Sequence, residues 1–159
     1  MWQMLLKFSY LLKLYRKMKI TDTMRNTNRN IWSRRLAFQA IYSWSINPCD
    51  IKELEAIFES DENFEKSDGD YFKDIVKGVI DNIDTIDNSI KKKSLIDIKN
   101  INMVELSIIR CYVYEIIYNK KIAKQILISE SIKLATKFGG QDSYKFINAF
   151  LDNFETIEK

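Results

Sequence analysis

Apolar residues recur along most of the chain at intervals of three and four, which is the spacing of amphipathic helices. The strongest such pattern is a stripe of Ile and Val that predicts one long helix over residues 70–92. A similar pattern predicts a first helix over residues 31–45, which Asn47 and Pro48 end. A short helix is expected to follow with Asp50 as its cap, and the polar residues 60–69 predict a loop.

Three further helices are predicted over residues 102–118, 124–138 and 142–154. Gly139 is expected to follow the end of the second of these, and Asp142 to cap the third. One Pro and four Gly are too few turn residues for a β-sandwich or barrel. The sequence therefore predicts an all-α fold of about six or seven helices.

The chain of 159 residues is 46% apolar, which suits one domain with its own core. Lysines and arginines divide the apolar part of residues 1–20 into runs far shorter than the roughly 18 residues that span a bilayer. In a secretory signal, positive charge would precede the apolar part, whereas here it follows. Two interpretations of this stretch remain: a basic amphipathic helix that touches a membrane or partner, or translation from a start codon that is not the native one.

Charge is distributed unevenly along the chain. Residues 1–48 carry a net charge of +8 and residues 49–159 one of −5, which together give the overall +3. A basic arm on an acidic body suggests a polyanionic partner that binds through the arm. On charge alone, a basic tail that binds nothing in particular is an equal alternative.

Several kinds of catalytic chemistry are missing. The chain has no His, so Ser-His-Asp and Cys-His pairs cannot form, and it has neither GxxxxGK[ST] nor GxGxxG loops for phosphates. Cys49 and Cys111 stand alone without CxxC spacing, so neither a zinc site nor a disulfide framework is expected. Much of hydrolase chemistry and nucleotide-dependent catalysis is therefore excluded, no metal or cofactor is expected, and a reducing cytoplasm is the expected compartment.

An arginine-rich arm leads into the first helix with the sequence RNTNRNIWSRRLAFQ. Guanidinium groups pair with phosphates and stack on bases, so Arg29, Arg34 and Arg35 are candidate contacts for single-stranded RNA, beside an exposed Trp32. The alternative is a solubilising start to a helix.

A second candidate RNA site lies in FGGQDSYKFINAFLDNF, at the predicted start of the last helix. The free amides of a helix N-terminus bind anions or base edges, and an exposed Phe146 ring could stack on a base. The polar candidates here are Gln141, Asp142, Ser143 and Lys145. In the alternative interpretation, Phe146 belongs to the core and Asp142 is only a cap.

Two carboxylates, Glu105 and Glu115, lie on or beside the apolar face of the helix predicted over residues 102–118. A carboxylate in such a place is costly unless it meets a cation or a hydrogen-bond donor. Internal pairing, for instance with Arg110 or Lys145, is one possibility.

Residues 34–44, RRLAFQAIYSW, and residues 126–154, ILISESIKLATKFGGQDSYKFINAFLDNF, resemble the NusB family of transcription antitermination proteins. The similarity extends over residues 24–154. It implies two small helical bundles packed together, and an arginine arm and last-helix start that bind boxA single-stranded RNA. This chain has Asn30, Ile31 and Trp32 where relatives often carry Arg, so a weaker contribution of the arm is expected.

The resemblance also implies a binding factor that is not an enzyme, without a small-molecule substrate or a membrane partner, and it implies protein partners and a domain organisation. A small-subunit ribosomal protein, NusE, is expected to dock on the helix that contains Glu105, within a complex that keeps RNA polymerase processive through ribosomal RNA operons. Met24 opens the arm as family members begin, so residues 1–23 are expected to be an N-terminal extension, for which a mis-assigned start is one origin, and residues 24–159 the RNA-binding domain. A helical protein-interaction adaptor with weak or no RNA binding is the alternative.

Overall fold

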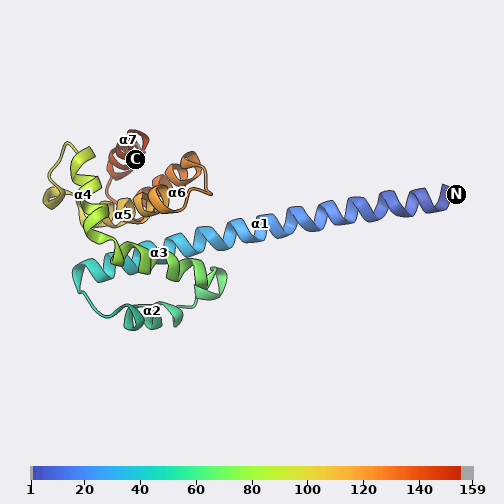
Figure 1. The fold of residues 1–159 in the computed structure, drawn as a ribbon, viewed down its shortest axis with the longest axis horizontal. Coiled ribbons are helices and arrows are strands. Elements are labelled where there is room, and N and C mark those ends of the chain that lie inside the picture. The colour runs from blue at the N-terminus through green and yellow to red at the C-terminus, as the bar shows by residue number, and fades with distance from the viewer. Residues whose placement is uncertain (1, 155–159) are drawn as a thin grey trace.

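The computed structural model describes residues 2–154, and within this range the regular structure is entirely helical. Figure 1 shows the arrangement of the helices. They are α1 (Trp2–Ile46), α2 (Ile51–Glu59), α3 (Gly69–Asp81), α4 (Ile83–Lys93), α5 (Met103–Tyr118), α6 (Lys124–Phe138) and α7 (Ser143–Asp152), with short 3₁₀ helices η1 (Phe64–Lys66) and η2 (Ile98–Asn100). The predicted all-α fold is confirmed.

The helices form two small bundles that share a core. The C-terminal part of α1 packs with α2 and α3, while α5 packs with α4, α6 and α7. Helix α5 also contacts α1 and α3, so it joins the two bundles. Its residues Ile108, Ile109 and Tyr112 are fully or almost fully buried, as expected of the most central helix.

The arginine arm is not a polar stretch ahead of the first helix, because α1 is continuous from Trp2 to Ile46. Its N-terminal half extends away from the other helices (Figure 1). The C-terminal half of α1 contacts the body, and there Arg29 and Ser33 donate hydrogen bonds to the carbonyls of Ser67 and Asp68. No helix in the described part of the chain is long and apolar enough to cross a membrane.

The single helix predicted over residues 70–92 is wrong, since the chain breaks at Asn82 between α3 and α4. The Asn82 side-chain amide donates to the carbonyl of Gly78, and this local bond competes with continuation of the helix. The apolar stripe nevertheless continues across the break, with Ile75 and Ile86 both fully buried. Gly78 packs against the Tyr114 ring so closely that any Cβ would collide with the ring. The absence of a side chain at Gly78 therefore allows α3 and α5 to approach each other.

The joint between α6 and α7 depends on the small size of Gly139. Its backbone φ of −88° is open to any residue, so the left-handed conformation typical of a helix-ending glycine is absent here. A Cβ at this position would lie 2.6 Å from both the carbonyl oxygen of Ala135 and the Cβ of Ser143. Asp142 occupies the cap position of α7 as predicted, but its side chain makes no capping hydrogen bond.

Candidate nucleic-acid interface

The structure brings the two candidate RNA segments together. Phe138, the last residue of α6, packs its ring 5.3 Å from the ring of Phe38 on α1. The guanidinium of Arg35 lies 5.3 Å over the same Phe138 ring. The arm on α1 therefore lies beside the end of α6, next to the joint that begins at Gly139.

Arg35 is held by aromatic rings. Its guanidinium carbon lies 4.7 Å from the centre of the Trp32 ring, in addition to its contact with Phe138. Among the described residues it forms no ion pair, and its buried Nε has no hydrogen-bond partner. Cation–π contacts orient the guanidinium without neutralising its charge, so Arg35 remains able to pair with a phosphate.

Trp32 is half-buried, in contrast to the exposed ring expected from the sequence. Besides Arg35, it contacts Lys66 of η1, whose Nζ lies 4.8 Å from the ring centre. The Trp32 ring thus contacts two cations, Arg35 of α1 and Lys66 of η1.

Arg34 does not fit the role of an RNA contact. Its side chain is only 4% exposed, and its Nε and Nη1 donate to Glu115 of α5 at 2.9 Å and to Glu130 of α6 at 2.7 Å. Its Nη2 donates to the Tyr71 hydroxyl of α3 at 2.8 Å. All the guanidinium nitrogens are committed inside the protein, so Arg34 is withdrawn from the predicted RNA residues.

This buried network links four helices and shifts the ionisation of its members. Burial raises the pKa of Glu115 above the ordinary value, although the charge of Arg34 acts in the opposite direction. Burial and the neighbouring carboxylate of Glu115, which accepts a hydrogen bond from Tyr71, raise the pKa of the tyrosine. The network fixes the rotation of α1, and therefore the direction in which the adjacent Arg35 points.

Arg29 is exposed, and its side chain lies along the end of η1. Its Nε and Nη2 donate to the carbonyl of Ser67 at 3.1 and 3.0 Å. A carbonyl leaves the positive charge of the guanidinium uncompensated. Arg29 therefore remains a candidate phosphate contact, at a fixed position.

At the start of α7 the polar candidates have different surroundings. Gln141, Asp142 and Lys145 are exposed, and Lys145 pairs with Asp142 at 3.3 Å. Ser143 is only 5% exposed, and its hydroxyl both accepts from the Gly140 amide and donates to Glu105, so it supports the joint from inside. Ser143 is therefore withdrawn from the direct RNA contacts.

Phe146 is half-buried. Its ring packs at the edge of the core, with its centre 6.3 Å from that of Phe150. Part of the ring therefore remains open on the face where α7 begins.

The two carboxylates of α5 both meet partners, as predicted from their position. Glu105 accepts a hydrogen bond of 2.6 Å from Ser143, and Glu115 belongs to the network around Arg34. The partners considered from the sequence are engaged elsewhere, since Arg110 pairs with Asp87 at 2.8 Å and Lys145 with Asp142. Glu105 thus lies directly beside the joint that carries the second group of RNA candidates.

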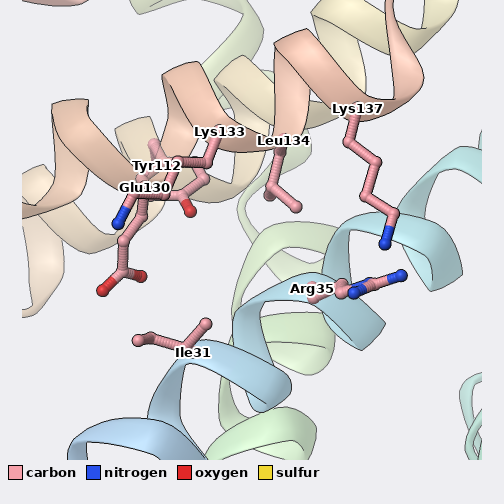
Figure 2. Close-up of a pocket in the computed structure, with 7 residues that line it drawn as sticks. All are labelled: Ile31, Arg35, Tyr112, Glu130, Lys133, Leu134 and Lys137. Carbon is pink, nitrogen blue, oxygen red and sulfur yellow. The ribbon is translucent and has the colours of Figure 1, made fainter.

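Lys66, Lys133 and Lys137 belong to the same surface but were not singled out from the sequence. Lys133 and Lys137 are exposed on α6, and they line a groove between α6 and α1 together with Arg35 (Figure 2). Their four-residue spacing places both on one helix face and could have revealed them. No sequence pattern connects Lys66 with Trp32. Within the described range, no cluster of His, Cys, Asp or Glu could hold a metal ion.

Comparison with known proteins identifies the family. Residues 32–156 match the model of the NusB family. The transcription antitermination protein NusB of Shewanella denitrificans is 34% identical over 120 residues, which cover 76% of this chain and 90% of the relative. Its counterpart in Nitrosomonas europaea is 33% identical over 129 residues, covering 81% of this chain and 77% of the relative.

Solved structures agree with this assignment. NusB of T. maritima superimposes with a TM-score of 0.67 at 26% identity, covering 77% of this chain and 87% of that one. A NusB chain from a complex of antitermination factors NusB and NusE with dsRNA shares the fold, with a TM-score of 0.68 at 22% identity over 78% of this chain and 93% of that one. The relatives are named as transcription antitermination proteins, which confirms the prediction that the chain is not an enzyme. The chain belongs to the NusB family.

Proposed function

We propose that this protein is a cytoplasmic transcription antitermination factor that binds boxA single-stranded RNA together with NusE. In this role it would act with RNA polymerase on ribosomal RNA operons. The names of the relatives support antitermination, and a related NusB has been solved with NusE and dsRNA. The observation that carries the proposal is Arg35, a cation without an ion-pair partner among the described residues, stacked on Phe138 where α1 meets the α6–α7 joint.

The proposed RNA surface consists of side chains that are exposed or half-buried on this side of the molecule. Arg29 and Arg35 would contact phosphates, Phe146 would stack on a base, and the start of α7 would offer polar groups to base edges. The polar groups at the start of α7 are Gln141, Asp142 and Lys145. Arg34 and Ser143 act from within, by orienting α1 and the joint.

Glu105 is the proposed contact for NusE. It lies in the first turn of α5, half-buried, with its Oε1 held by Ser143. Ser143 also accepts a hydrogen bond from the Gly140 amide in the α6–α7 joint. A partner that contacts Glu105 would therefore be linked through Ser143 to the proposed RNA-binding joint. This arrangement favours joint binding of RNA and partner over two independent sites.

Titration of a fluorescent boxA single strand, with and without NusE and over a range of salt concentrations, tests the proposal. The Arg35→Gln variant should bind more weakly, and its log-log salt slope should be smaller by about 0.7, the value for one lost phosphate contact on a single strand. Lys92→Gln removes one exposed charge from α4 and should leave the slope unchanged. A duplex of the same sequence measures the preference for single strands.

Two results would contradict the proposal. If NusE binds the protein but neither the protein nor the pair binds the RNA, the chain is a protein-interaction adaptor. An unchanged salt slope for Arg35→Gln would show that Arg35 does not contact a phosphate, which removes the observation that carries the proposal.

We further propose that residues 24–159 suffice for this function and that residues 1–23 are an N-terminal extension. The family model begins at residue 32, and Arg29 and Ser33 join α1 to the residues around η1. Deletion of residues 1–23 should therefore leave thermal unfolding and RNA affinity close to those of the full chain. An insoluble protein, or a much lower melting temperature, would show that the extension belongs to the fold.

A further inference from the structure

The groove between α1 and α6 has a volume of about 140 Å³ and is lined mainly by apolar atoms. Ile31 forms one side and Leu134 the other, while Tyr112 of α5 lies between them at the back (Figure 2). A volume of this size holds several water molecules, which is enough for a planar ring to enter. Ile31 is 37% exposed, so the groove opens to solvent beside the arm.

The Tyr112 hydroxyl is a polar group aimed into this apolar groove. The residue is only 1% exposed, and its hydroxyl has no hydrogen-bond partner among the described residues. Figure 2 shows the hydroxyl facing the space between Glu130 and Leu134. Among the described side chains, the fully buried polar atoms without a partner are Arg35 Nε and Ser107 Oγ, and the Tyr112 hydroxyl is not one of them. The hydroxyl is therefore reachable from the groove, and a ligand that enters can form a hydrogen bond with it.

The rim of the groove is strongly positive. Arg35, Lys133 and Lys137 surround the opening, and Lys137 also lies 5.7 Å over the ring of Phe138. The carboxylate that lines the groove, Glu130, is already paired with Arg34. An apolar slot with one hydroxyl inside and three cations outside is complementary to a nucleotide, with its base inside and its phosphates at the rim.

We propose that this groove receives one unstacked base of the bound single-stranded RNA. The inference rests on the proposed function and adds a specific subsite to it. The base lies against Ile31 and Leu134, its edge hydrogen-bonds to the Tyr112 hydroxyl, and the adjoining phosphates contact Lys133 and Lys137. Single-stranded RNA suits this site because its bases can turn out of the stack, whereas bases of a duplex are paired.

The test combines a variant that fills the groove with RNA that lacks single bases. Ile31→Trp places a large ring at the open side of the groove, and Ile57→Trp is the matched control, because Ile57 is 55% exposed on α2. A set of boxA single strands, each with one abasic position, is titrated against the full-length wild type and both variants. Tyr112→Phe removes only the hydroxyl and serves as a second probe of the groove.

For the wild type, one abasic position should reduce affinity about tenfold or more, as expected for loss of one bound base. Ile31→Trp should weaken binding of intact RNA to a similar extent and abolish the effect of that position, whereas Ile57→Trp should change neither. Tyr112→Phe should reduce the effect of the same position without lowering the salt slope.

Two outcomes overturn the inference in distinguishable ways. If RNA binds with the expected salt dependence but every abasic position costs the same in the wild type and Ile31→Trp, no base enters the groove, and the proposed function stands. If no strand binds, with or without NusE, both proposals fail.

Discussion

Arg34 belongs to the buried core and not to the RNA surface, so its removal should destabilise the fold. Arg34→Ala removes a cation that holds Glu115 at 2.9 Å and Glu130 at 2.7 Å, both nearly inaccessible to solvent. Two carboxylates would be left close together without their counter-ion. Removing one partner of a buried ion pair typically costs about 3–5 kcal/mol.

Urea unfolding followed by circular dichroism measures this loss. Domains of this size are commonly stable by only about 5–15 kcal/mol, so Arg34→Ala should remove a large share of the free energy of unfolding. Arg34→Lys retains the charge but cannot reach three acceptors in a planar fork, and it should fall between wild type and Ala. This second variant keeps the measurement possible if the Ala variant does not fold.

RNA titration of the same preparations separates the structural role from a direct one. The folded fraction of Arg34→Lys should bind boxA RNA with the wild-type salt slope, because the guanidinium does not face the RNA. Stability within about 0.5 kcal/mol of wild type for Arg34→Ala, accompanied by a smaller salt slope, would refute the reasoning and return Arg34 to the RNA contacts.

Three further predictions follow from local geometry. Gly139→Ala should destabilise the protein by about 1–3 kcal/mol in urea unfolding through steric overlap alone, and a neutral change would mean that the α6–α7 joint relaxes freely. Phe146→Ala should cost roughly 1–2 kcal/mol of stability, below the about 3–5 of a fully buried ring, and roughly 1–3 kcal/mol of RNA affinity; unchanged affinity would remove its stacking role. Burial raises the pKa of the Cys111 thiol above its ordinary 9.0, so the unfolded chain loses this proton first and stability falls as the pH rises above about 9. Cys111→Ala should make the fall between pH 9 and 10 less steep, and an unaltered slope would contradict this.

Helical periodicity was sufficient to predict most of the fold, because burying one face of each helix leaves a spacing of three and four in the sequence. Helix α6 has the predicted bounds, and Asp50 caps α2 by accepting from the Lys52 amide, as expected. The break at Asn82 could not be seen in this way, since the buried stripe has the same phase on both sides. A hydrogen bond from one side chain to one carbonyl interrupts the helix without changing the hydrophobic pattern.

The candidate site was predicted less well, because neighbouring residues on a helix point in directions about 100° apart. Arg34 lies three, four and seven residues before Ala37, Phe38 and Ile41, all of which are buried. The burial of Arg34 could therefore have been predicted from its spacing. The cluster of neighbouring arginines instead favoured the prediction of an RNA contact. The hydrogen-bond acceptors of Arg34 could not be predicted from the sequence, because Glu115 and Glu130 are distant in the chain and meet Arg34 only when α5 and α6 pack on α1.

The position of Arg35 in the structure changes the role expected for Trp32. Trp32 stands where the family resemblance leads to an expectation of arginine, and the sequence alone suggests a weaker RNA contact for that reason. In the structure, Trp32 and Phe138 together fix the Arg35 guanidinium, and Trp32 also contacts Lys66. A side chain that is already ordered loses less conformational entropy when it binds a phosphate. The Trp32 ring orients Arg35 and Lys66, and this offsets part of the charge lost by having no arginine at position 32. In a salt titration of RNA binding, Trp32→Arg should therefore increase the salt slope but raise the affinity by less than an added phosphate contact would.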